Sequence, residues 1–136
     1  RIRTSKLSAT RKDADNRKEV NDIGFGSITV RENVFGFRQN FALKEGDNII
    51  GRYNPGDSIT IPIDTNDRSM DRRHCVITVK RDSSGDISYT LRDFPSLTGT
   101  FLFNRILGDR EKVLIEDGAI ITLGATTIIL QAPQKQ

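Results

Sequence analysis

Apolar and polar residues alternate in short runs along most of the chain after residue 22. In 59–63 isoleucine occupies every second position, and in 87–91 isoleucine, tyrosine and leucine do the same. A period of two places the apolar side chains of a β-strand on one face of a sheet. The pattern predicts ten strands, at 27–31, 35–43, 48–52, 59–63, 73–80, 87–93, 100–103, 112–115, 119–123 and 126–131.

Turn-forming residues separate these runs, in 45–48, 54–57, 82–86 and 116–118. Glycine, proline, asparagine and aspartate favour tight turns. Short strands with turns at this spacing predict an all-β sandwich or barrel. We expect no helix after residue 22. Pro62 lacks a backbone N–H, which favours a sheet edge or a bulge for its strand.

The composition is that of one globular domain. The chain has 136 residues, of which 35% are hydrophobic and 29% charged, enough for a hydrophobic core. No apolar run approaches the roughly 20 residues that span a bilayer, and the N-terminal residues lack the apolar region of a signal peptide. We therefore expect a cytoplasmic domain without membrane contact.

The positive charge is concentrated at the N-terminus. Residues 1–20 have a net charge of +4, whereas the remainder has a net charge of −1. We interpret 1–22 as a disordered basic tail or linker, 23–132 as the folded domain and 133–136 as a C-terminal tail. A basic tail is able to contact nucleic acid, but the folded part has no basic excess, so we expect no nucleic-acid binding.

The residues that common enzymes and metal sites require are scarce. Cys75 is the single cysteine and His74 the single histidine, which excludes an intramolecular disulfide and a cysteine-based zinc site. No nucleophile elbow, phosphate-binding Walker loop or His-Glu-x-x-His motif occurs. We therefore expect a binding domain with no enzyme activity, no cofactor and no metal.

Several motifs follow one another in a fixed order: Ile49-Ile50-Gly51-Arg52, Arg72-Arg73-His74-Cys75, the 91–101 segment LRDFPSLTGTF, Asn104, and the 114–124 segment LIEDGAIITLG. The ordered set resembles the forkhead-associated (FHA) family, over about residues 23–131. In that family Gly-Arg ends a strand and is followed by Ser-Arg-x-His, Ser-x-Asn-Gly-Thr-Phe, an asparagine and Gly-Asp-x-Ile-x-Leu-Gly. The resemblance implies an FHA-like β-sandwich of the SMAD/FHA type, with about 11 mostly antiparallel strands and binding loops at one end.

The resemblance also implies a function, namely binding of phosphothreonine-containing protein segments in signalling. Phosphothreonine carries about −1.5 to −2 charges, which an arginine can meet with two parallel hydrogen bonds. Arg52 matches the arginine that contacts the phosphate in the family. His74 matches a histidine that braces the loops, and Gly51 and Gly99 match positions that support the site.

Two residues depart from the family pattern. Asp71 replaces the phosphate-binding serine, and Thr98 replaces the asparagine that bonds the peptide backbone. A carboxylate about 6 Å from a phosphate dianion costs roughly 5 kcal/mol at an effective dielectric constant near 20, whereas a hydrogen bond to a charged group returns about 1.5–3 kcal/mol. A pairing of Arg72 with Asp71 would reduce the repulsion. Arg73 would add positive charge near the phosphate, and Ser69 would supply a hydroxyl group.

Asn104 matches the second asparagine of the family pattern, but Arg105 replaces the glycine that follows it, which puts the tight turn there in doubt. Two functions stay open. The first is a phosphothreonine reader that uses Arg52, Ser69, Asp71, Arg72, Arg73, Thr98 and Asn104. The second is an FHA-like scaffold that binds a protein without phosphate. A phosphorylated Thr10 in the chain's own tail, with Asp13 three residues later, is a further candidate ligand.

Overall fold

The computed structural model describes residues 23–134. The expected tail at 1–22, including Thr10, lies outside the described residues, as do the last two residues. Within 23–134 the chain forms eleven strands in two sheets, an all-β sandwich with the number of strands that the resemblance implies. No helix in this range is long and apolar enough to cross a membrane.

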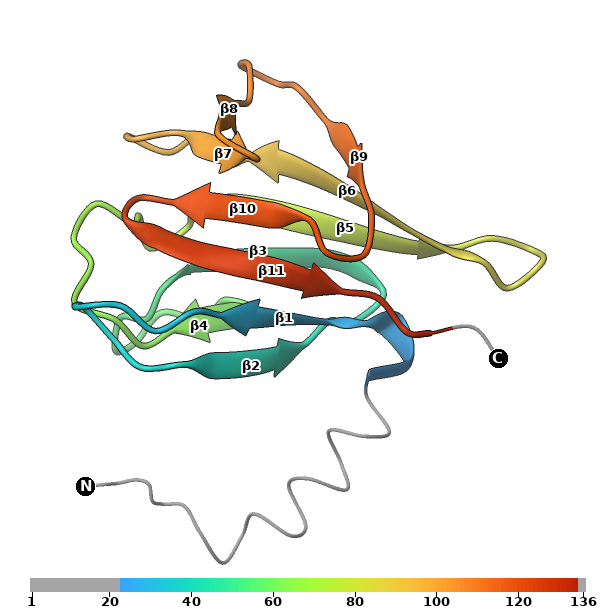
Figure 1. Cartoon of the computed structure of the whole chain (residues 1–136), viewed down its shortest axis with the longest axis horizontal. Helices are drawn as coiled ribbons and strands as arrows, with labels where there is room; N and C mark the ends of the chain where they lie inside the picture. The colour runs from blue at the N-terminus through green and yellow to red at the C-terminus, as the bar shows by residue number, and fades with distance from the viewer. Residues whose placement is uncertain (1–22, 135–136) are drawn as a thin grey trace, which may run out of the picture.

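The two sheets contain six and five strands (Figure 1). The order in the first sheet is β2 (Gln39–Ala42), β1 (Ser27–Val30), β11 (Thr126–Gln131), β10 (Ile120–Leu123), β7 (Thr100–Leu102) and β8 (Arg105–Ile106). The order in the second is β4 (Ile61–Ile63), β3 (Gly46–Arg52), β5 (Cys75–Arg81), β6 (Ile87–Asp93) and β9 (Val113–Ile115). All strand pairs are antiparallel except β3 with β4.

The core lies between the sheets and follows the alternation in the sequence. Along β11 Thr126, Ile128 and Leu130 are buried, while the residues between them are partly exposed. Pro62 lies in β4, which is the edge strand of its sheet, as the missing N–H predicts. The largest fully buried side chains come from both sheets and from the loops between them: Ile28, Leu43, Ile50, Ile61, Ile63, Met70, Ile77, Leu91, Ile121, Leu123, Ile128 and Leu130.

Several strand ends differ from the prediction by one or two residues, and β3 begins within the predicted turn 45–48. Three larger local features also differ. The expected strand 35–43 is shorter, because a turn between Asn33 and Gly36 occupies its first part and leaves Gln39–Ala42 as β2. β8 was not predicted; it has two residues, and the hairpin turn before it consists of Phe103 and Asn104, with φ of 48° and 72°, rather than of the usual Asn-Gly. One turn of 3-10 helix, η1 (Ile23–Phe25), precedes β1 and is too short to produce a periodic pattern.

Five connections of the described chain lie at one end of the sandwich, at the left in Figure 1. They are the β1–β2 loop (31–38), the β3–β4 loop (53–60), the β4–β5 loop (64–74), the β6–β7 loop (94–99) and the β10–β11 turn (124–125). Because β3 ends and β5 begins at this end, the motifs around Arg52 and His74 lie there together with Thr98.

Candidate functional site

Arg52 is the last residue of β3 and lies against the β4–β5 loop. Its backbone N–H donates to the carbonyl oxygen of Asp71 at 2.9 Å, and its Nε donates to the carbonyl oxygen of Met70 at 3.0 Å. These bonds fix the direction of a side chain that is partly exposed to solvent. Among the described residues no hydrogen bond or ion pair engages its two terminal nitrogens. The side chain therefore keeps a pair of donors for an anionic ligand.

Gly51 permits the close approach of this loop to β3. A Cβ atom at position 51 would lie 2.1 Å from the carbonyl oxygen of Arg72 and 2.7 Å from that of Asp71. Both contacts are far shorter than van der Waals distance, and both involve backbone atoms. The glycine is therefore needed for the loop to rest where Arg52 can bond to it.

His74 is fully buried and connects two loops. The backbone N–H of Asp71 donates to its Nδ1 at 3.0 Å, while its Nε2 lies 2.8 Å from the carbonyl oxygen of Gly99. Since an N–H points at Nδ1, that nitrogen is the acceptor, and the ring proton is assigned to Nε2, which donates to Gly99. The ring holds the β4–β5 loop at a fixed distance from the β6–β7 loop.

Asp71 makes a second connection between the same loops. Its Oδ2 accepts a hydrogen bond of 2.9 Å from the backbone N–H of Leu97. The ion pairs between described residues lie elsewhere in the domain, so a pairing with Arg72 does not reduce the charge of this carboxylate. Arg72 and Arg73 are both exposed. The Asp71 carboxylate is thus held by the backbone N–H of Leu97 rather than by a cation.

The two hydroxyl groups of the expected site donate within the protein. Thr98 Oγ1 donates to the carbonyl oxygen of Ser69 at 2.9 Å, and Ser69 Oγ donates to Oδ1 of Asp67. Each hydroxyl has one proton, which these bonds use. In this arrangement Ser69 and Thr98 can offer a ligand only acceptor lone pairs, so donation to a phosphate requires their hydroxyls to rotate.

Asp67 is a buried carboxylate that the sequence analysis did not identify. Its Oδ2 accepts bonds from the backbone N–H of Ala125 at 2.9 Å and from Thr126 Oγ1 at 2.7 Å. Burial alone would raise the pKa of Asp67, but the hydrogen bonds from Ser69, Thr126 and Ala125 outweigh it and hold the pKa below its usual value. The ionised carboxylate thereby anchors the β4–β5 loop to the β10–β11 turn.

Asp93 supports the β6–β7 loop in a similar way. Its carboxylate accepts bonds from Ser96 N at 2.8 Å, Ser96 Oγ at 2.6 Å and Thr100 Oγ1 at 2.7 Å. Burial would raise the pKa of Asp93, yet these bonds hold it below its usual value. In turn Ser96 Oγ accepts from Gly99 N at 2.9 Å. The backbone around Thr98 is therefore rigidly supported.

The structure brings most of the expected site residues together. Hydrogen bonds and close backbone contacts join Gly51, Arg52, Ser69, Asp71, Arg72, His74, Thr98 and Gly99, and Arg73 follows directly in the chain. Asn104 is separate: it lies in the β7–β8 turn, and no hydrogen bond joins it to the others within 23–134. In the same range no cluster of histidine, cysteine and acidic residues is arranged to hold a metal ion.

The comparisons with known proteins concern this same region. A family model described as the FHA domain matches residues 48–124, which include β3 from its third residue and all the site residues. No curated protein matches the sequence.

Solved structures of FHA domains have the same fold. The FhaA FHA domain, complexed with the intracellular domain of Rv3910, is 25% identical over 78% of this chain and 99% of its own, with a TM-score of 0.59. The FHA domain of CT664 from Chlamydia trachomatis is 20% identical over 80% and 98%, with a TM-score of 0.62. The MEK1 FHA domain, in complex with a HOP1 phosphothreonine peptide, is 18% identical over 82% and 99%, with a TM-score of 0.66.

Proposed function

Because the chain belongs to the FHA domain family, we propose that its loop end binds a phosphothreonine-containing segment of a partner protein. FHA domains are non-catalytic binding modules, and the family generally binds phosphothreonine peptides. The proposal assigns that activity to this chain, as a protein-interaction module in signalling, and assigns the phosphate contact to Arg52.

The geometry of Arg52 carries the proposal. Its Nε and backbone N–H are bonded to the β4–β5 loop, at 3.0 Å and 2.9 Å, and hold the guanidinium in place before a ligand arrives. A guanidinium that is already fixed loses little conformational entropy on binding. Its two terminal nitrogens then meet two phosphate oxygens, the geometry in which arginine binds phosphate best.

Other residues of the site contribute in different ways. Arg72 and Arg73 add positive charge from the exposed loop, and this charge opposes the repulsion between Asp71 and the phosphate. After rotation, the hydroxyls of Ser69 and Thr98 donate to the phosphate or to the peptide backbone. Gly51, His74 and Gly99 support the loops, and Asn104 has no direct role in this arrangement.

A second candidate function is binding of a protein partner without phosphate. The specific observation in its favour is that no cation pairs with the Asp71 carboxylate among the described residues, while Thr98 and Ser69 use their hydroxyl protons inside the protein. A partner carboxylate, with one negative charge rather than two, is repelled less by Asp71. In that case binding does not depend on phosphorylation.

A titration with a degenerate phosphothreonine peptide library, followed by NMR, distinguishes the two functions. We expect chemical-shift changes around Arg52, Asp71 and Thr98 with the phosphorylated library and none with its unphosphorylated form. Arg52→Ala abolishes the response, whereas Lys80→Ala, an exposed cation near the opposite end of β5, leaves it intact. Equal binding of both libraries would support the phosphate-independent function instead.

A further inference from the structure

Large apolar side chains are exposed at the same end of the sandwich, next to Arg52. In the β1–β2 loop Val34 is 92% exposed, Phe37 63% and Phe35 37%. Tyr53, the residue after Arg52, is 49% exposed. We call these four residues the apolar ridge. Exposed apolar groups that gather on one part of a surface are typical of an interaction site.

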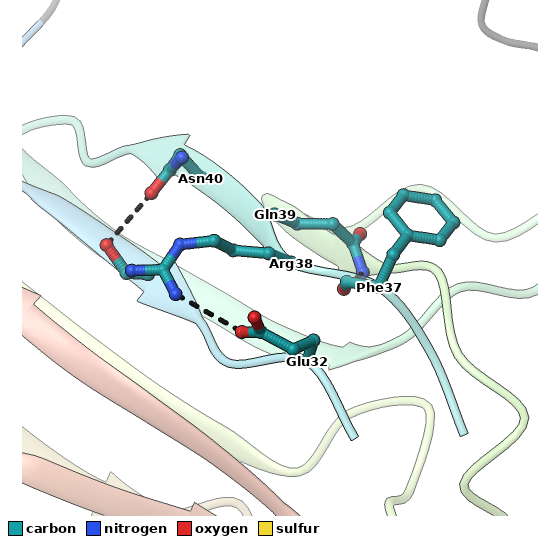
Figure 2. A network of polar contacts seen from close by, with 6 residues as sticks. Glu32, Phe37, Arg38, Gln39 and Asn40 are labelled. Carbon is teal, nitrogen blue, oxygen red and sulfur yellow. Dashed lines mark hydrogen bonds and ion pairs between the residues drawn. The ribbon is translucent and has the colours of Figure 1, made fainter. Parts of the chain in front are cut away.

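The loop that carries most of the apolar ridge is fixed by polar contacts. Asn33 and Gly36 exchange backbone hydrogen bonds of 2.9 Å and 3.3 Å, and Asn33 Nδ2 donates to the carbonyl oxygen of Ala125 at 3.2 Å. At the base of the loop Arg38 forms an ion pair of 3.2 Å with Glu32 (Figure 2). The ridge is therefore presented to solvent from an ordered support, which lowers the entropy cost of binding.

The apolar ridge is continuous with the loop that holds the proposed phosphate site. The carbonyl oxygen of Phe35 accepts a 2.9 Å hydrogen bond from the backbone N–H of Asn66, and Asn66 leads into Ser69 and Asp71. The ridge and the phosphate site thus share the β4–β5 loop as their common support.

Phe37 and Tyr53 lie on either side of the first residue of that loop, Asp64. Gln39 Nε2 donates to the carbonyl oxygens of both Phe37 and Asp64, at 3.2 Å and 2.9 Å. On the other side Tyr53 N donates to the carbonyl oxygen of Ile63 at 2.7 Å. In Figure 2 the Phe37 ring projects away from the Glu32–Arg38 pair. The backbones of Phe37 and Tyr53 thus flank one short stretch of chain next to Arg52.

We propose that the apolar ridge binds a bulky apolar side chain of the same partner segment whose phosphothreonine meets Arg52. This inference rests on the function proposed above and defines its ligand more closely: a phosphothreonine with an apolar residue nearby in the sequence. Arg52 pairs with Ile63 across one strand spacing of about 4.8 Å, and Gln39 joins the following residue, Asp64, to Phe37, so the separation of Phe37 from Arg52 is short. An extended segment, at about 3.3 Å per residue, covers it within a few residues.

Asp71 gives this second contact a physical reason. Its charge weakens the grip of Arg52 on a phosphate, because both act on the same dianion. Apolar contact on the ridge is unaffected by that charge and adds affinity through burial of hydrophobic surface. A segment that carries both a phosphothreonine and a nearby apolar side chain therefore binds more tightly than a segment with the phosphothreonine alone.

The test uses fluorescence anisotropy with uncharged phosphothreonine peptides. In the reference peptide, called the alanine peptide, alanine occupies the tested positions, from four residues before to four residues after the phosphothreonine. In each further peptide a single leucine or phenylalanine replaces one of these alanines. We expect at least one position to raise the affinity of the native protein about fivefold to tenfold. In Phe37→Ser and Tyr53→Ser that gain disappears, while affinity for the alanine peptide stays the same. Leu114→Ser, which removes another exposed apolar residue, on β9, keeps the gain.

The outcomes separate the two proposals. If phosphothreonine peptides bind through Arg52 but no apolar position changes the affinity, the ridge inference is wrong and the proposed function stands. The ridge inference is likewise wrong if Phe37→Ser weakens the binding of the apolar-substituted peptides and of the alanine peptide equally. If no peptide binds better than its unphosphorylated form, both proposals are overturned. Urea unfolding of each serine variant shows whether the fold is intact.

Discussion

The carboxylate of Asp71 accepts a 2.9 Å hydrogen bond from the backbone N–H of Leu97. The bond joins the β4–β5 and β6–β7 loops, which His74 also connects from inside the protein. Under the proposed function, Asp71 therefore has two opposing effects on a phosphate ligand. It positions the loops that surround the ligand, and it repels the ligand's charge. Substitutions that separate the two effects follow from this arrangement.

Asp71→Asn removes the charge and keeps an oxygen that can accept the Leu97 hydrogen bond. We expect the affinity for a phosphothreonine peptide to rise at least tenfold, about 1.4 kcal/mol, because the repulsion is lost while the loop contact remains. Isothermal titration calorimetry at low and high salt measures the change. The gain should be smaller at high salt, where exposed charges are screened.

Asp71→Ala provides the comparison, since it removes both the charge and the acceptor. We expect a smaller gain than with Asp71→Asn and a lower free energy of unfolding, because Leu97 N–H loses its partner. Equal affinity of Asp71→Asn and the native protein for the phosphopeptide would show that the carboxylate lies too far from the phosphate to repel it.

Gly51→Ala tests the close contact between β3 and the β4–β5 loop. The new methyl group would lie 2.1 Å from the carbonyl oxygen of Arg72, so the loop must move away from Arg52. We expect a loss of about 1–3 kcal/mol in unfolding free energy and loss of phosphopeptide binding. Gly24→Ala is the matched control, because no atom lies within 4 Å of its added Cβ. Similar unfolding midpoints in urea for both variants would contradict this view of Gly51.

His74→Ala removes the internal connection between the loops. Asp71 N–H and the carbonyl oxygen of Gly99 then lose their partners inside the protein, and a cavity remains. Unsatisfied buried groups and cavities each cost roughly 1–3 kcal/mol. We expect the free energy of unfolding, measured in urea, to fall by about 3 kcal/mol. This loss is well above the one expected for Cys75→Ala, which truncates the neighbouring fully buried residue. A loss no larger than that of Cys75→Ala would argue against a bracing role.

Most strands were predictable because alternation marks them directly, whereas the choice of an FHA-like sandwich followed from the resemblance. The runs at 87–93 and 126–131 coincide with β6 and β11, since a period of two specifies which side chains enter the core. The position of Arg52 at the loop end also followed from its place as the last residue of a predicted strand and from the resemblance. Both features depend on residues that are close together in the sequence.

The polar framework of the site was not predictable in the same way. Asp67 bonds to Ala125 and Thr126, which lie 58 and 59 residues later in the chain. In the sequence it is one of several acidic residues in a polar loop, and no local pattern separates a buried carboxylate from a solvated one. The directions of the Ser69 and Thr98 hydroxyls depend on the same folded framework.

This framework predicts how the stability of the domain depends on pH. The pKa of Asp67 is lower in the folded protein than in the unfolded chain, where it is about 3.9. Its contribution is therefore complete above that pH and is lost as the pH falls through the folded-state pKa. We expect a constant contribution to the unfolding free energy above about pH 5 and a decline below about pH 4.

The variant Asp67→Asn tests this dependence. At pH 7 its free energy of unfolding should be about 1–3 kcal/mol lower than that of the native protein, and this difference should shrink at pH 3. The exposed control Asp109→Asn should change the free energy of unfolding little at either pH. Urea unfolding at several pH values measures this, and a difference that stays constant down to pH 3 would mean that the charge of Asp67 does not stabilise the loop.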